Sequence, residues 1–384
     1  MTFRGRATAA AVAVGLLTVA GFVGIGHDPV NPAPNEVRKA DPSLSPDPSA
    51  AQATTEAPGD ALRSALDDLC SGEDRSASVF APSIEQMQAR LEPFDQWQRR
   101  LLETLAQSSS AEHLHFAALL ERDPASQVEL IRRAVSLEPN DAFTLWTAVH
   151  VCADKREATG CPLRDWEQRL VQVDGQNSES WLRVAANRYQ ARDLDTAIEA
   201  LRRAATSAET RAYWTETIEM AERGYAVIGD RSFPERAAMA FGVAASNLPN
   251  VGDYVNMCKA QAEASVEWAY ACLAYGETAE KQGKTEMGVS IGLAIQLRAL
   301  EALGEPEKFA EVEQRKEARA KEKRAVYSKN RAPIEELMVS TPALFSSYLA
   351  SLRTYGELGA QSLLADEMQR LLQHEPELAC ANQP

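Results

Sequence analysis

Beyond Asp60 the apolar residues of this chain recur three and four positions apart, almost to the end of the sequence. This spacing places them on one face of a helix, and no alternating β-branched run of strand length interrupts it. Proline, glycine and asparagine mark short breaks, which fall at 123–124, 138–140, 160–162, 174–175, 229–230, 249–250, 283, 304–306, 333 and 342. Short connections favour antiparallel helical hairpins, so we predict an all-α fold.

One helical hairpin recurs in the middle of this region. The segment LEPNDAFTLW (137–146) aligns with VDGQNSESWL (173–182), which lies 36 positions further along the chain. The unit 178–211 resembles a tetratricopeptide repeat (TPR) through Trp181, Ala185, Ala197, Leu201 and Ala204. Arg188 and Arg192 depart from the usual aromatic and turn-glycine positions of that repeat. The preceding unit, 108–141, matches it through Leu114, Ile131, Ala134 and Pro139.

The resemblance implies a TPR-like solenoid over residues 61–303, in which hairpins are stable only when stacked. In that family, fixed positions of each first helix line a concave groove. They correspond here to Glu112, Phe116, Leu119, Phe143, Trp146, His150, Leu182, Ala186 and Tyr189. Such an aromatic and apolar groove suits an extended or helical segment with apolar anchors. Packing against additional helices is the alternative use of the same residues.

Residues 304–384 differ in character from the repeats. Their first part is densely charged, and acid-to-base pairs such as Glu311 with Arg315 and Glu317 with Lys321 favour a solvent-exposed helix. The last part predicts a helical hairpin with its turn near Gly356. We expect this hairpin to cap the solenoid, because the terminal unit of such an array must shield the final apolar face.

The N-terminus predicts export. Residues 1–6 are basic, and the twenty residues 7–26 carry no charge, so a helix there would span about 30 Å, the thickness of a bilayer core. Its basic end would stay in the cytoplasm, which makes 7–26 an inner-membrane anchor with the rest facing the periplasm. A cleaved signal peptide is the alternative, since 24–26 is Gly-Ile-Gly; the chain would then be soluble in the periplasm or secreted. Residues 27–60, rich in Pro, Ala and Ser, predict a disordered tether.

Six cysteines beyond an export segment indicate disulfides. Cys152 ends one predicted helix and Cys161 begins the next, so their side chains can meet across the turn. Cys258 and Cys272 can meet only if the chain turns near 264–265; on one continuous helix they would lie about 21 Å apart. Elimination leaves Cys70 and Cys380 as a third pair. No CxxC spacing is present, and we expect neither a metal nor a cofactor.

Catalytic signals are poor. His113 and His115 point to different sides of a helix, and 283–285 (Gly-Lys-Thr) lacks both the preceding glycine and the strand of a phosphate-binding loop. A net charge of -15 argues against nucleic-acid binding. The chain also resembles exported bacterial envelope proteins that carry no assigned activity. We therefore expect a non-enzymatic periplasmic scaffold that binds an envelope protein or peptide; the alternative is an envelope enzyme or ligand-binding protein acting on peptidoglycan fragments.

Overall fold

The computed structural model describes residues 62–63, 84–154, 160–248, 251–329 and 337–374. The predicted segments 1–6, 7–26 and 27–60 lie outside these residues, as do Cys70 and Cys380. Within the described ranges, no helix combines the length and the apolar character needed to cross a bilayer.

The described residues form fourteen helices and no strand, which confirms the all-α prediction. In chain order they are α3 (Ile84–Ala106), α4 (Ala111–Leu120), α5 (Pro124–Leu137), α6 (Ala142–Asp154), α7 (Leu163–Val173), α8 (Ser178–Gln190), α9 (Leu194–Ala205), α10 (Trp214–Ala226), α11 (Phe233–Ser246), α12 (Val251–Ala264), α13 (Val266–Gln282), α14 (Glu286–Ala302), α15 (Pro306–Lys329) and α17 (Pro342–His374). The helices pack mainly with their chain neighbours, which is consistent with a solenoid of helical hairpins.

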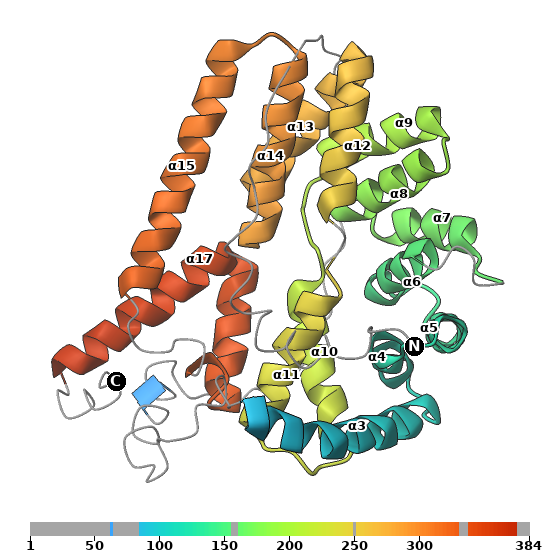
Figure 1. Ribbon diagram of the computed structural model, residues 1–384, viewed down its shortest axis with the longest axis vertical. Helices are drawn as coiled ribbons and strands as arrows, with labels where there is room; N and C mark the ends of the chain where they lie inside the picture. Colours follow the sequence, from blue (N-terminus) through green and yellow to red (C-terminus); the bar gives the residue numbers. More distant parts are fainter. Residues whose placement is uncertain (1–61, 64–83, 155–159, 249–250, 330–336, 375–384) are drawn as a thin grey trace, which may run out of the picture.

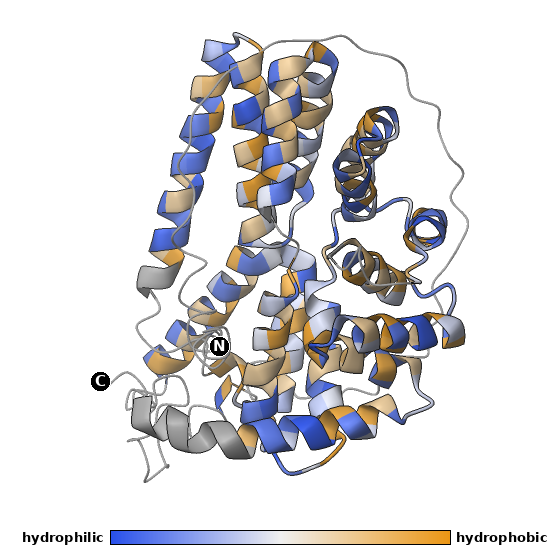
Figure 2. Ribbon diagram, turned by 45° about the vertical axis from the view of Figure 1, so that its right-hand side comes forward, coloured by the Kyte–Doolittle hydropathy of each residue, from blue (hydrophilic) through white to orange (hydrophobic). Residues whose placement is uncertain are grey.

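The hairpins follow a curved path (Figure 1). Helices α3 to α9 succeed one another along one side, and α12 to α14 stand beside the end of this row. The path bends back on itself, because α13 packs on α9 and α10 packs on α4. Figure 2 shows polar residues on the outer faces of these helices and apolar ones between them. Two large cores result: one joins α3–α7 to α10, α11 and α17, and the other joins α8 and α9 to α12–α14.

Local sequence explains where several of these helices begin. Asp123 caps α5 by accepting a hydrogen bond from the Ser126 amide, and Pro124 follows in the first turn, where it is tolerated. Thr285 caps α14 in the same way through the Gly288 amide. Arg192, at the turn-glycine position of the predicted repeat, has a left-handed backbone with φ 61°. The hairpin thus keeps the turn geometry that the family's glycine normally provides.

Two of the predicted disulfides are present. Cys152 bonds Cys161, and Cys258 bonds Cys272, each with 5.8 Å between the Cα atoms. The second pair meets because α12 ends at Ala264 and α13 begins directly after Ser265, as the sequence required. Disulfides of this kind persist in oxidising compartments, which agrees with the predicted export.

The C-terminal region is held to the solenoid by polar contacts. On α15, Arg315 pairs with Glu280 of α13 at 2.9 Å, and the Glu311 carboxylate one turn away adds to the negative charge around it. Helix α17 bends at Gly356, where φ is 77°, and Figure 1 shows its two arms diverging from this bend. At the bend, the Glu357 amide donates to the Lys284 carbonyl at 2.7 Å. The predicted turn near Gly356 therefore docks α17 onto the connection between α13 and α14.

Candidate functional site

The residues of the predicted groove lie on α4, α6 and α8, and they differ in exposure. Phe116, Trp146, Leu182 and Ala186 are buried. Partial exposure is shared by Glu112, Leu119, Phe143, His150 and Tyr189.

Helix α10 covers most of the aromatic part of this face. The Phe116 ring meets Tyr225 edge-on at 5.0 Å, and Phe143 stacks on Tyr213 at 5.2 Å. Trp146 lies 5.6 Å from the same Tyr213 ring. Of the two uses considered for these side chains, packing against additional helices is the one that these contacts show.

The remaining groove positions also contact other parts of the chain. Glu112 accepts a hydrogen bond from Arg223 of α10 at 2.8 Å. Tyr189 lies against Trp268 of α13, with 6.4 Å between the ring centroids. His150 Nδ1 accepts a hydrogen bond from the Arg183 guanidinium at 2.7 Å. The row of first helices is thus lined on its inner side by α10 and α13.

His115, between α4 and α6, makes folding sensitive to acid. Its ring is fully buried beside Phe143, and burial lowers its pKa from 6.5 to about 4, although the Asp141 carboxylate opposes this. Between pH 6.5 and about pH 4, His115 binds a proton in the unfolded chain but not in the folded chain. The free energy of unfolding therefore falls as the pH falls through this range. We expect a loss of about 2.5 kcal/mol between pH 7.5 and pH 4.5.

Urea unfolding of His115→Gln at the two pH values checks this expectation. Between pH 7.5 and pH 4.5, the free energy of unfolding of His115→Gln should fall by about 2.5 kcal/mol less than that of the wild type, because glutamine does not titrate. His113→Gln, at a partly exposed position of the same helix, controls for the loss of a histidine side chain as such. If the free energy of unfolding of His115→Gln fell with pH as much as that of the wild type, the effect could not be assigned to His115.

A cleft of about 530 Å³ lies where the two cores meet. One wall comprises Glu179 of α8 and residues 208–216, which span the end of the connection between α9 and α10 and the first turn of α10. The opposite wall comprises 281–285, from the end of α13 and its connection to α14, together with 352–353 of α17. No sequence motif marks this cleft, because the segments that form its walls are far apart in the chain.

Hydrogen bonds between the walls hold the cleft open at a defined width. The Gln282 amide donates to the Ser207 carbonyl at 3.3 Å, and Thr210 Oγ1 donates to Gln282 Oε1 at 3.4 Å. Arg353 of α17 pairs with Glu219 of α10 at 2.5 Å. The cleft therefore does not depend on an occupant for its shape.

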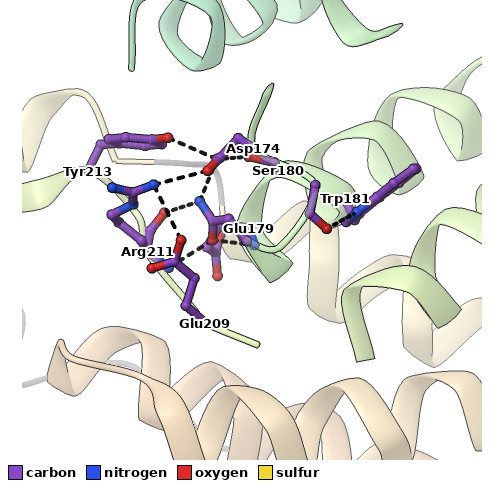
Figure 3. Close-up of polar contacts among 9 residues, drawn as sticks. Asp174, Glu179, Ser180, Trp181, Glu209, Arg211 and Tyr213 are labelled. Atoms are coloured by element: carbon purple, nitrogen blue, oxygen red, sulfur yellow. Dashed lines mark hydrogen bonds and ion pairs between the residues drawn. The ribbon is translucent and has the colours of Figure 1, made fainter. Parts of the chain in front are cut away.

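Asp174, at the end of α7, anchors the first wall (Figure 3). Its Oδ2 atom accepts from Asn177 Nδ2 at 2.8 Å and from the Tyr213 hydroxyl at 2.8 Å. Its Oδ1 atom accepts from Arg211 Nη2 at 3.0 Å, and Ser180 adds a further donor. Burial and the Asp174 carboxylate raise the pKa of the Tyr213 phenol, so it stays a donor. This carboxylate therefore fixes Arg211 and Tyr213, the residues that lead directly into α10.

Residues 209–212 of this wall form a non-helical segment with one paired edge, and Tyr213 after them has a left-handed backbone, with φ 54°, at the start of α10. The Glu209 amide donates to the Gln176 carbonyl at 3.0 Å, and the Glu209 carbonyl accepts from the Ser178 amide at 2.8 Å. The Arg211 amide and carbonyl bond the Asn177 side chain, each at 2.9 Å. These bonds form an isolated parallel bridge between Asn177 and Glu209.

The other edge of this segment is unpaired. The backbone N–H and C=O groups of Ala208, Thr210 and Ala212 have no hydrogen-bond partner within the described part of the chain. Alternate residues of an extended chain direct these groups to opposite sides, so the unpaired ones point away from Gln176 and Asn177. All three residues line the cleft. The arrangement is able to accept another extended chain as a neighbouring strand.

No protein-family model, curated protein or solved structure matches this chain.

Proposed function

We propose that this chain is an exported, TPR-like, non-enzymatic scaffold that binds an extended segment of an envelope protein or peptide in the cleft between 208–216 and 281–285. The observation that carries the proposal is the unpaired edge of Ala208, Thr210 and Ala212. An extended peptide gains affinity from main-chain hydrogen bonds at such an edge. The two disulfides and the predicted export segment 7–26 support a location at the periplasmic face of the inner membrane or in the periplasm.

The proposed binding site is the cleft, not the groove that the repeat resemblance implied. The groove face of α4, α6 and α8 is packed against α10 and α13, whereas the cleft combines open volume with unsatisfied backbone groups. Backbone groups that line an open cleft can form main-chain hydrogen bonds with an occupant, and each such bond contributes about 0.5–1.5 kcal/mol. The hairpins act as the support that positions this edge.

Photo-cross-linking in the cells that make the chain tests the proposal. A photoreactive phenylalanine at Ala208, which is exposed in the cleft, should form adducts with one segment of an envelope protein or peptide. The same residue at Lys321, exposed on α15, should not. Ala212→Pro removes a donor of the unpaired edge and should reduce the adduct about tenfold, because one hydrogen bond contributes roughly 1–1.5 kcal/mol. Ala212→Val keeps that donor and is the matched control.

Two results would reject the proposal. One is the absence of adducts at position 208. The other is an equal yield in Ala212→Pro and in Ala212→Val, which would mean that the captured protein does not pair with the backbone of the segment.

A further inference from the structure

Trp214 brings an aromatic side chain into the cleft beside the unpaired edge of Ala208, Thr210 and Ala212. It is the first residue of α10 and follows Ala212 by two positions. Its side chain is partly exposed, because it packs against the core of α3–α7, α10, α11 and α17 and also lines the cleft. A segment that pairs with Ala212 would therefore lie next to the indole.

The indole of Trp214 is not used by the rest of the described chain. Trp181 Nε1 donates to the Gly175 carbonyl at 2.9 Å, whereas Trp214 Nε1 has no acceptor among the described residues. This nitrogen is not buried, so it can donate to an occupant of the cleft. No ring or guanidinium within the described ranges stacks on the indole. Tryptophans that are apolar on one side and carry a free N–H are enriched at binding surfaces.

The backbone holds Trp214 in place before an occupant arrives. The preceding Tyr213 has a left-handed backbone, and its carbonyl accepts from the Thr217 amide at 2.9 Å and from Thr217 Oγ1 at 2.8 Å. The Tyr213 hydroxyl donates to Asp174 at 2.8 Å. The first turn of α10 is thus anchored immediately before the indole. A side chain that is already positioned loses little entropy when a ligand binds to it.

The opposite wall places little bulk against such an occupant. Gly283, and Gly288 in the first turn of α14, both line the cleft. A Cβ atom at Gly288 would meet only Thr285 Oγ1 within 4 Å, so the space in front of this glycine is open. The indole is therefore the larger apolar surface that a side chain of the occupant can cover.

A proline fits the position beside the indole. In a strand added at the unpaired edge, only alternate residues direct their N–H groups toward that edge. A proline at an intervening position therefore removes no bond to the edge, and its fixed φ is compatible with an extended chain. Grooves lined with aromatic rings bind proline-containing segments, because the chain is already extended before it binds.

We infer that the cleft selects a short extended segment in which a proline packs on Trp214, while the residues on either side of the proline pair with the unpaired edge. The inference rests on the proposed function and names the class of segment bound. The cleft volume of about 530 Å³ lies within the range of pockets that enclose a drug-sized ligand, which suits a short segment.

Three peptides without charged residues, which differ at one position, test the inference on the purified full chain. They are fluorescein-GTSTPTSTG-amide and the same peptide with alanine or leucine in place of proline. In fluorescence anisotropy, the proline probe should bind about tenfold more tightly than the alanine probe, because its ring covers apolar surface of the indole. The leucine probe should bind about threefold more weakly than the proline probe, since its flexible side chain loses rotamer freedom.

Two variants assign the preference to the indole, and a third is the matched control. Trp214→Leu should bring the affinities for the proline and alanine probes within about twofold of each other, because the aromatic anchor is lost. Trp214→Phe keeps a ring and should retain most of the preference. Tyr355→Leu removes a ring that is 64% exposed on α17 and does not line the cleft, so it should leave the preference unchanged.

The outcomes separate the inference from the function on which it rests. Equal binding of the proline probe and either of the other probes by the wild type would overturn the inference without any variant. A preference that persists in Trp214→Leu would also overturn it. In both cases, probe binding that is lost in Ala212→Pro leaves the peptide-binding function in place. If no probe binds, the inference fails, and the cross-link at position 208 decides whether the proposed function fails with it.

Discussion

Asp174→Ala is expected to lower the free energy of unfolding by about 4 kcal/mol. The carboxylate is buried at the junction of α7 with the segment 209–212, where four side chains donate to it. Alanine would leave the buried side chains of Asn177, Ser180 and Tyr213 without this acceptor. A buried donor that loses its acceptor costs about 1–3 kcal/mol, and the partly exposed Arg211 adds less. Urea unfolding followed by far-UV circular dichroism measures the loss.

Two further variants show whether the cost belongs to the Asp174 network. Tyr213→Phe removes one donor and should cost about 1 kcal/mol, the usual net value of one hydrogen bond. Glu209→Ala removes the exposed partner of the same arginine and should cost less than about 0.5 kcal/mol. A loss below 1 kcal/mol in Asp174→Ala would show that the network is not what holds the first wall of the cleft.

The role of Asp174 could not be predicted from the sequence. The pair Asp174 and Gly175 correctly marked the end of a helix, because aspartate and glycine favour such turns. Its partners Arg211 and Tyr213 lie beyond the whole next hairpin, α8 and α9. Only the stacking of α7, α8 and α9 brings these groups together, and one sequence contains no signal for that contact.

The sequence contained a sign that the face predicted as a groove is covered by another part of the chain. Helix α4, AEHLHFAALL, is apolar on nearly all sides, and seven of its residues are buried. A helix that is apolar all round is buried on all sides, whereas a groove helix keeps an open face. The family pattern assigned Phe116 to that open face, but the composition of the helix already indicated a covering element. What the sequence could not show is that α10 supplies the cover.

The disulfide pairs were predictable to the extent that they are local. Cys152 and Cys161 needed only the turn between α6 and α7. The pairing of Cys258 with Cys272 depended on a helix break at 264–265, and no proline or glycine marks a break there. The structure places Ser265 between α12 and α13 with an extended backbone, φ -152° and ψ 125°, which separates the two helices.

Two glycines, Gly276 of α13 and Gly292 of α14, set how these two helices pack. A Cβ atom at Gly292 would lie 2.7 Å from the Gly276 carbonyl oxygen, and one at Gly276 would lie 2.8 Å from the Gly292 carbonyl oxygen. Helices α13 and α14 therefore cross with their backbones in direct contact. Gln296 fills the adjacent space and donates to the Gly276 carbonyl at 3.1 Å.

Gly292→Val is therefore expected to cost about 4 kcal/mol in the free energy of unfolding. Its Cβ atom would also lie 2.6 Å from the Glu280 amide nitrogen, closer than real contacts of this kind. Overpacking usually costs 1–3 kcal/mol, occasionally more, and here the atoms in the way are backbone atoms that cannot rotate aside. The two helices would have to separate, which would expose the core that they share with α8, α9 and α12.

Gly288→Ala, one turn earlier on α14, is the control that distinguishes this contact from a general effect of replacing glycine. Its Cβ atom would meet only Thr285 Oγ1, at 3.2 Å, and a hydroxyl can move by the few tenths of an ångström required. Alanine also favours helix over glycine by about 1 kcal/mol, so this variant should be as stable as the wild type or slightly more stable. Differential scanning calorimetry of both variants should place the melting temperature of Gly292→Val well below that of Gly288→Ala. Equal melting temperatures would mean that α13 and α14 do not cross at Gly276 and Gly292, and the α13–α14 connection would then lose the support that positions Lys281 and Lys284 in the cleft.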